Sequence, residues 1–370
     1  MRCDIEGAEA RSAAYFDRYV FDVVKGIALI LMFIHHFFTF PSWYVPEISY
    51  PALESFAVHF SAPTRICVSV FAFLSGYFYC FNGDKTFRYS LRKISDLLIA
   101  YWAVYALLLL AAYAAAGYVP DRRAVVFELF AIKRPVMCFC WYVVFYYTFM
   151  SVLPLLYRLL DRGIPAAILF GVVLPVVVSR MIALQFSSDV VQEIVAEFAP
   201  WFQVTAVGYL FARYDLFRRI FDAAWKDPLG KTARVAVWLL LACAAFFARF
   251  YCTWFSFGPI AYKTGEMSVT FNPDMLYAPV FLYAVGNLCA LLPREKLGAA
   301  VMRVGRYSLL MWFFHCVFFG PSRDVAQRLL FFPKFPPLVL LWGLALCYAA
   351  ARLVDPLIRL LTARKNRIFF

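Results

Sequence analysis

Long apolar stretches separated by short charged segments dominate the pattern of this chain. A helix that crosses the hydrocarbon core of a membrane needs about 20 mostly apolar residues. Ten segments approach that length, at roughly 20–40, 64–82, 95–118, 137–157, 164–183, 198–213, 235–254, 275–292, 306–320 and 337–358. The sixth and ninth are short, which is typical of broken or tilted helices that line a cavity. The pattern predicts an all-α polytopic membrane protein with about ten transmembrane helices.

The composition supports the membrane class. Hydrophobic residues make up 64% of the 370 residues and aromatic residues 20%, and the mean hydropathy is +0.71. Soluble domains are about 45–50% apolar. Because no long polar block is left over, we expect one transmembrane domain over residues 20–358. A cytoplasmic N-terminal segment (1–19) and a basic cytoplasmic tail (359–370) would flank it.

The distribution of basic residues predicts the orientation of the chain. With a cytoplasmic N-terminus, the inner segments hold 23 Lys and Arg and the outer loops hold 8. Lys and Arg are enriched in cytoplasmic loops, so we expect both termini in the cytoplasm and a multi-pass protein of the cell's inner (plasma) membrane. The net charge of +13 also favours contact with anionic membrane lipid. Nucleic acid is not an expected partner, because the chain has no soluble basic domain to bind it.

The first apolar segment carries four ionisable side chains: Asp22, Lys25, His35 and His36. His36 follows Lys25 by 11 positions, which in an α-helix places the two on one face within about 20° and about 16 Å apart along the axis. His35 points about 100° away. Asp22 precedes Lys25 by three positions, a spacing that allows a local ion pair.

Ionisable groups inside a membrane are costly and usually face a cavity or pathway. A neutral imidazole can accept a proton near neutral pH. We therefore interpret His36 as a catalytic general base, Lys25 as a cation on the donor side, and Asp22 as the partner that supports Lys25. The alternative is that Lys25 extends to the membrane interface and the histidines bond to neighbouring helices.

Five motifs, in order, resemble those of one known family. The stretch "RYVFDVVKGIALILMFIHH" (18–36) resembles the first helix of the membrane-bound acyltransferase family 3. Four later stretches resemble its other motifs: "SVFAFLSGYFY" (69–79), "LRKISDLLIAYW" (91–102), "WYVVFYY" (141–147) and "VGRYSLLMWFFH" (304–315). The resemblance extends over about residues 18–360. Ala100 stands where the family usually has proline, and Asp96 stands where a basic residue is common.

The resemblance implies an integral-membrane O-acyltransferase. The expected donor is cytoplasmic acyl-CoA, usually acetyl-CoA, and the expected acceptor is a hydroxyl of a sugar in a surface or exported glycan or a glycolipid. No bound cofactor is expected, and a homo-oligomer remains open. The nucleotide end of acyl-CoA is anionic, and Arg and Lys bind phosphates. We therefore expect donor contacts from Lys25, Arg88, Arg92 and Lys93, although the last three could instead serve only as a topology signal.

Three further side chains are candidates for lining the cavity or the acceptor site. His315 is expected at about the depth of His36, Ser75 could donate to a developing oxyanion, and Trp141 could stack on a sugar. Each has a simpler interpretation: an interhelical hydrogen bond for His315, close helix packing at Ser75 and Gly76, and an interface residue for Trp141. Cys138 and Cys140 form a C-x-C pair without a second pair, so no metal site is expected.

Two other functions are compatible with the same residues. A proton-coupled or glycan transporter could use His35, His36 and His315 as a relay, but the repeated halves common in transporters are not seen in the sequence. The protein could also pass an acyl group across the bilayer to a separate enzyme. Acyl-CoA hydrolysis or transfer by the purified protein separates the transporter from the other two.

Overall fold

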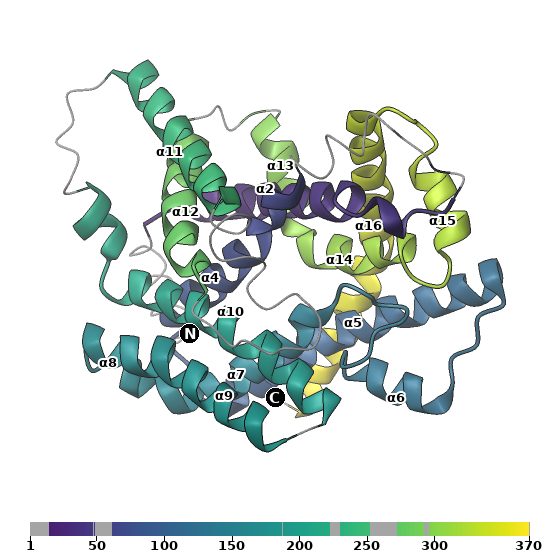
Figure 1. Cartoon of the computed structure of the whole chain (residues 1–370), viewed down its shortest axis with the longest axis horizontal. Helices are drawn as coiled ribbons and strands as arrows, with labels where there is room; N and C mark the ends of the chain where they lie inside the picture. Colours follow the sequence, from purple (N-terminus) through teal and green to yellow (C-terminus); the bar gives the residue numbers. More distant parts are fainter. Residues whose placement is uncertain are drawn as a thin grey trace. The chain divides into compact units, whose positions relative to one another are not determined.

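The computed structural model describes residues 15–46, 48, 61–186, 188–222, 230–251, 272–291, 295 and 297–369, and every regular element in these ranges is a helix (Figure 1). Residues 1–14 of the expected N-terminal segment, Phe370 and much of the expected outer loops 41–63 and 255–275 lie outside the described residues. The chain packs as two compact units. The first contains residues 1–28, 65–86 and 152–305, and the second contains residues 29–64, 87–151 and 306–370.

Seven helical segments in the described ranges are long and apolar enough to cross a membrane, namely Arg18–Phe38, Phe87–Ala116, Trp141–Leu160, Ile164–Ile182, Thr232–Arg249, Asp274–Leu291 and Pro336–Phe369. Ile66–Cys80 and Ser308–Phe318 are shorter apolar helices. The helix at the sixth expected segment (198–213) differs most from the prediction. It belongs to α10 (Asp189–Arg213), a helix of 25 residues with Pro200 inside it. Polar residues at 189–197 hid its first turns from a hydropathy count, so the expectation of a short segment there is wrong.

Close backbone contact holds the first unit together. Its helices are α4 (Ile66–Cys80), α8 (Ile164–Ile168), the π-helix η4 (Leu169–Val173), α9 (Leu174–Gln185), α10, the π-helix η5 (Phe217–Asp222), α11 (Lys231–Tyr251), α12 (Asp274–Leu291) and α13 (Leu297–Arg306). The helix α10 packs on α4, α9 and α12, and α11 packs on α12. A Cβ on Gly76 would lie 1.8 Å from the Thr205 carbonyl oxygen, and one on Gly208 would lie 2.1 Å from that of Phe73. Glycine at both positions lets α4 and α10 meet backbone to backbone.

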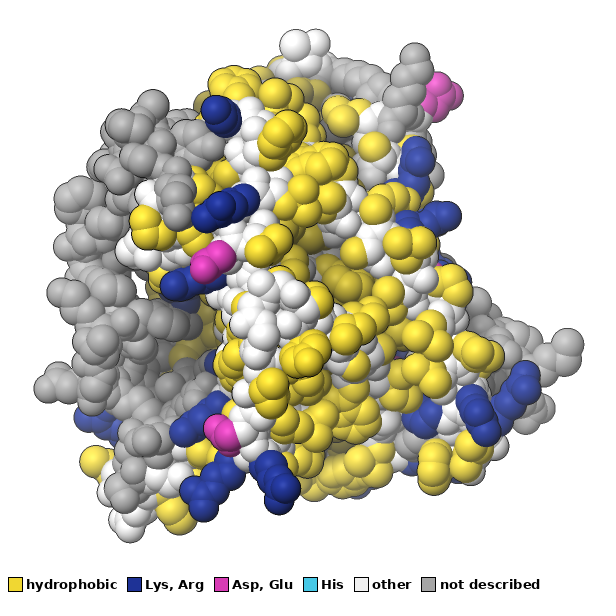
Figure 2. Space-filling model, turned by 90° about the vertical axis from the view of Figure 1, so that its right-hand side faces the viewer, with side chains coloured by type: hydrophobic (Ala, Val, Ile, Leu, Met, Phe, Trp, Pro, Cys, Tyr) yellow, Lys and Arg dark blue, Asp and Glu magenta, His cyan; other side chains and the backbone are white. Residues whose placement is uncertain are grey.

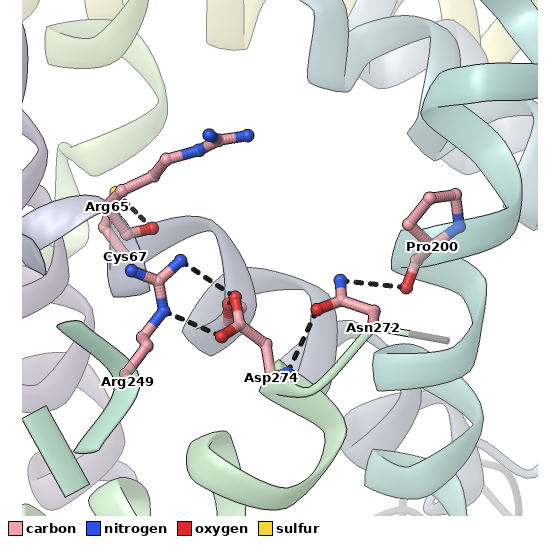
Figure 3. Close-up of polar contacts among 7 residues, drawn as sticks. Arg65, Cys67, Pro200, Arg249, Asn272 and Asp274 are labelled. Atoms are coloured by element: carbon pink, nitrogen blue, oxygen red, sulfur yellow. Dashed lines mark hydrogen bonds and ion pairs between the residues drawn. The ribbon is translucent and has the colours of Figure 1, made fainter. Parts of the chain in front are cut away.

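A buried ion pair connects three helices of the same unit (Figure 3). Arg249 on α11 binds Asp274 at the start of α12 through two bonds, Nε to Oδ1 at 2.7 Å and Nη2 to Oδ2 at 3.0 Å. Ser69 of α4 also donates its hydroxyl to Oδ2. Both charged residues are about 5% exposed or less. Such a bidentate pair keeps its charges satisfied in a low-dielectric interior.

The second unit contains α5 (Phe87–Ala116), α6 (Arg122–Leu129), α14 (Ser308–Phe314), the 3-10 helix η7 (His315–Phe318), α15 (Arg323–Leu330) and α16 (Pro336–Phe369), with the 3-10 turn η1 (Pro41–Trp43). The helices α2 (Arg18–Phe38) and α7 (Trp141–Leu160) have residues in both units. The helix α16 packs on α5, α14 and α15. Gly343 of α16 leaves room for the Phe37 ring, which would be 2.5 Å from a Cβ there.

The surface of α16 is apolar over much of its length. Leu341, Leu353, Leu357 and Leu360 are 50% to 81% exposed, which is typical of a helix that faces lipid rather than water. Figure 2 shows one face of the molecule on which apolar side chains cover a broad area and Lys and Arg outnumber Asp and Glu. Residues 359–369 continue α16 as helix, and an Arg359–Asp355 ion pair at 2.8 Å supports this extension.

Candidate active site

The helix α2 brings His36 to its last turn. Its beginning is fixed by Asp17, whose Oδ1 accepts a hydrogen bond from the Val20 amide at 2.9 Å, as an N-cap side chain does. The segment that follows is rich in apolar residues, and its buried side chains include Leu29, Phe33 and Phe37. The helix ends at Phe38, just before Pro41 opens the turn η1. His36 therefore lies where the helix gives way to a turn.

The central feature of the second unit is a pair of imidazoles that are far apart in the sequence. His36 Nδ1 lies 2.8 Å from His315 Nε2, and the two rings are nearly parallel, with 7° between their planes. His315 is completely buried, whereas His36 keeps partial exposure. One residue of the pair thus keeps some exposed surface, and the other supports it from within the core.

The hydrogen-bond partners assign the tautomers. His315 Nδ1 bonds the Trp312 carbonyl oxygen, which can only accept, so Nδ1 carries the hydrogen and Nε2 of a neutral His315 is an acceptor. His36 Nδ1 must then donate to it. In a neutral His36 the basic lone pair is consequently on Nε2. This orientation by a second group is typical of a side chain that serves as a general base.

Aromatic rings enclose the pair. The Phe139 ring stacks on His36 at 4.1 Å with 15° between the planes, and the Phe33 ring stacks on His315 at 5.5 Å. Trp43 and Phe319 also contact the Phe139 ring, at centroid distances of 5.3 Å and 5.2 Å. The imidazoles are therefore held in a largely apolar aromatic environment, in which hydrogen bonds and charges act more strongly than in water.

A buried glutamine ties two backbone segments of this site together. Gln327 of α15 accepts from the Val45 amide at 2.8 Å, and its Nε2 donates to the carbonyl oxygens of Trp43 at 3.0 Å and of Phe318 at 2.9 Å. These bonds satisfy both polar atoms of a completely buried side chain. They fix the segment after α2 against the 3-10 helix that begins with His315.

His35 belongs to a different hydrogen-bond network. Its Nδ1 lies 3.3 Å from the Ser61 carbonyl oxygen and 3.1 Å from the Thr39 hydroxyl, which also donates to the Ser61 hydroxyl at 2.8 Å. The structure thus directs the Nδ1 atoms of the two neighbouring histidines to different partners. His35 has the contacts of a structural histidine, while His36 faces His315.

The expected ion pair near the start of α2 is present in the first unit. Lys25 Nζ lies 2.6 Å from Asp22 Oδ1, and the Asp22 side chain is only 6% exposed. Gly26, next to Lys25, lies so near α13 that a Cβ would be 2.2 Å from the Val301 carbonyl oxygen. Asp22 therefore balances the Lys25 charge where α2 and α13 cross.

The other expected donor residues lie on the first turns of α5, in the second unit. Arg88 is exposed, whereas Arg92 and Lys93 are half-buried and lie over the Tyr89 ring at 5.4 Å and 5.6 Å. Asp96, the acidic residue in this basic stretch, accepts from Lys365 Nζ at 2.6 Å. The local charge of this face of α5 is therefore set by Lys365 as well as by the three expected cations.

Ser75 and Trp141 have local contacts. The Ser75 hydroxyl donates to the Phe71 carbonyl oxygen of its own helix at 2.8 Å, and Ser75 belongs to the first unit. Trp141 begins α7 and packs edge-on against Tyr142. The residue that stacks on His36 is instead Phe139, two positions earlier. The "WYVVFYY" motif is recognisable in the sequence, whereas nothing in the sequence predicts a role for Phe139 just before it.

Two buried polar residues near the pair were also missed from the sequence. Gln327 and Glu128 are both completely buried, yet each lies in a segment that the sequence predicts as an outer loop. A polar residue in such a segment is ordinary in a sequence and does not indicate burial. Their roles depend on contacts with distant segments that spacing alone does not reveal.

Apolar helices of membrane-spanning length, together with a buried, oriented imidazole pair, define a polytopic membrane protein with a site suited to proton transfer. The sequence model of the acyltransferase domain matches residues 18–352, so the chain belongs to the acyltransferase 3 family. No curated protein and no solved structure matches it significantly. The family membership supports acyltransferase activity in a membrane protein and confirms the resemblance described above.

Proposed function

We propose that the protein is an O-acyltransferase that moves an acetyl group from cytoplasmic acetyl-CoA to a sugar hydroxyl of a surface or exported glycan. The observation that carries the proposal is the His36–His315 hydrogen bond. It supports an oriented imidazole on the partly exposed residue and a buried partner behind it. In a family of acyltransferases, such a pair is suited to remove the proton from an acceptor hydroxyl.

His36 and His315 can account for every proton transfer that the reaction requires. The acceptor oxygen attacks the thioester carbonyl carbon while its proton passes to His36 Nε2. The tetrahedral intermediate then collapses, the carbon–sulfur bond breaks, and the CoA thiolate takes up the proton from the His36 imidazolium. His315 accepts the Nδ1 hydrogen bond throughout and stabilises the imidazolium, as the third group of a catalytic triad does.

The donor nucleotide is assigned to basic side chains. Arg92→Ala and Lys25→Ala should each raise the KM for acetyl-CoA with little change in kcat, because phosphate contacts are made in the ground state and the transition state alike. Steady-state kinetics at two ionic strengths measure this, and the effect of Arg92→Ala should shrink at high salt. Arg122→Ala, which removes an exposed cation from α6, is the matched control. An unchanged KM in both donor variants would place the nucleotide elsewhere.

His315 supplies a second prediction. His315→Ala removes the acceptor of the His36 Nδ1 hydrogen bond and should lower kcat by about 10–100-fold, as the loss of an orienting outer partner does in other sites. His315→Gln, whose amide oxygen can accept the same hydrogen bond, should recover part of the loss. Both are measured as CoA release from acetyl-CoA. Equal rates for wild type and His315→Ala would remove His315 from the catalytic arrangement.

The acceptor is tested in cells. Mass spectra of surface polysaccharide from cells with and without the protein should differ by acetyl groups on sugar hydroxyls. Identical spectra, together with no acetyl-CoA consumption by purified protein, would favour a transporter that uses the same histidines. Acetyl-CoA consumption without a direct glycan product would indicate delivery to a separate enzyme.

A further inference from the structure

Glu128 is a buried acidic residue whose carboxyl group binds a loop. It lies near the end of α6 and has no exposed surface. Its Oε1 accepts hydrogen bonds from the amides of Val136 and Met137, both at 2.7 Å. The Tyr101 hydroxyl of α5 donates to the Glu128 carbonyl oxygen at 2.8 Å. Glu128 thus joins α5, the end of α6 and segment 135–140, which leads into α7.

Segment 135–140 forms one wall of the imidazole pair. Phe139 lies on it and stacks on His36 at 4.1 Å. On either side of Phe139, Cys138 Sγ lies 3.9 Å from the Cys316 carbonyl oxygen and Cys140 Sγ lies 3.7 Å from Cys316 Sγ. Among the polar contacts of the segment within the described residues, the two amide–carboxyl bonds are stronger than these sulfur contacts. Met137 is two residues from Phe139, so a shift of its amide is carried directly to the stacked ring.

We propose that Glu128 is a positioning residue: its carboxyl group holds segment 135–140 in the place where the Phe139 ring stays stacked on His36. The inference rests on the proposed role of His36 as general base. Phe139 limits the orientation of the imidazole and keeps water from its face, so Glu128 acts on the reaction through Phe139 and not by touching the substrate. A carboxyl group is suited to this because one oxygen can accept from two adjacent amides.

The charge state of Glu128 gives the arrangement a dependence on pH. Burial raises the pKa of the Glu128 carboxyl group, and the two amide hydrogen bonds lower it. Burial has the larger effect, so the pKa is about 7. The groups that face it are Tyr101, Tyr105, Tyr118, Arg134 and Cys316. In the described part of the chain, Oε2 has no hydrogen-bond partner. Burial outweighs the two amide bonds and favours the neutral acid while segment 135–140 is held in place.

The shifted pKa of Glu128 determines how the stability of segment 135–140 changes with pH. The pKa of Glu128 is higher in the folded protein than the ordinary value of about 4.3 in an unfolded chain. The stabilisation of the loop is fully present below the unfolded value and is lost as pH rises through about 7. Above that pH the buried carboxylate favours a loosened loop, in which Phe139 covers His36 less well.

The test uses the purified full-length protein with two measurements. One is the rate at which diethyl pyrocarbonate modifies His36, followed by mass spectrometry of its peptide, and the other is kcat and KM for CoA release from acetyl-CoA. Glu128→Ala should raise the modification rate and lower kcat by about 10-fold with an unchanged KM. Glu128→Gln, which keeps an oxygen for both amides, should lack the extra rise in His36 modification that wild type shows as the pH increases from about 5 to about 7.

Asp121→Ala is the matched control, because Asp121 caps the same helix from an exposed position, with Oδ1 accepting from the Ala124 amide at 2.8 Å. It should leave both measurements near wild type. The proposal is overturned if Glu128→Ala leaves His36 modification and kcat unchanged, or if Asp121→Ala changes them as much. If Glu128→Ala does not fold, the comparison of Glu128→Gln with wild type across pH decides. A wild type that releases no CoA would refute the proposed function, while the modification rates would still test Glu128.

Discussion

His36→Ala is expected to lower kcat by about 10²–10⁴-fold, the range typical for the loss of a positioned general base. His36 Nδ1 is committed to His315, which leaves Nε2 as the nitrogen that can take the acceptor proton. The variant should still insert and still bind acetyl-CoA, because the assigned donor contacts come from other side chains. CoA release with the purified protein and isothermal titration with acetyl-CoA measure the two properties separately.

The neighbouring histidine is the matched control for this prediction. His35 bonds Ser61 and Thr39 instead, so His35→Ala should keep most of the activity per folded molecule, although it removes a buried hydrogen-bonding group. The reverse result, with His35 essential and His36 dispensable, would place the catalytic face one residue away. If both variants stay fully active, no imidazole of α2 acts as the base.

Asp274→Ala is expected to reduce the free energy of unfolding by about 3–5 kcal/mol, because removal of one partner leaves the other charge buried and unpaired. Arg249 is 5% exposed and has two bonds to Asp274, so it would have to be desolvated without its counterion. Titration with denaturing detergent, followed by circular dichroism, measures the change. The effect should appear in stability and not in the KM for acetyl-CoA.

Two comparisons make the Asp274 prediction specific. Asp215→Ala breaks an Arg218–Asp215 pair whose N–O distance of 3.0 Å equals that of the longer Arg249–Asp274 bond, but whose side chains are 48% and 41% exposed, and it should cost less than about 1 kcal/mol. The double variant Arg249→Met with Asp274→Leu should recover most of the loss, because no buried charge is left behind. If Asp274→Ala and Asp215→Ala reduced the free energy of unfolding equally, burial would not determine how much an ion pair contributes to stability.

Much of the helical layout could be predicted because hydropathy is a local property. The segments around α2, α7, α11 and α12 were expected within several residues of their observed bounds. The beginnings of α5 and α10 and the extension of α16 were missed, because all three contain polar residues that lower a hydropathy count without breaking a helix. In α16 the Asp355–Arg359 pair at 2.8 Å shows how a charged sequence remains helical.

The site could be predicted only where its residues lie on one helix. The Asp22–Lys25 pair follows from a spacing of three, and the structure contains it at 2.6 Å. The contact between His36 and His315 joins residues 279 positions apart, so no local pattern contains it, and His315 was singled out only through its motif and its expected depth. Phe139, Gln327 and Glu128 act through loop geometry, which no helical period can predict.

The proposed acetyl transfer with His36 as general base is tested most directly with the purified protein in proteoliposomes. Radiolabelled acetyl-CoA is supplied on the cytoplasmic side, and an envelope extract of the source cells supplies the acceptor. Wild type should place label in the glycan fraction as an ester that mild alkali releases, and His36→Ala should place almost none. If the label stays in acetyl-CoA with wild type, the proposed acetyl transfer is contradicted. If both proteins transfer label equally, the proposed role of His36 is contradicted.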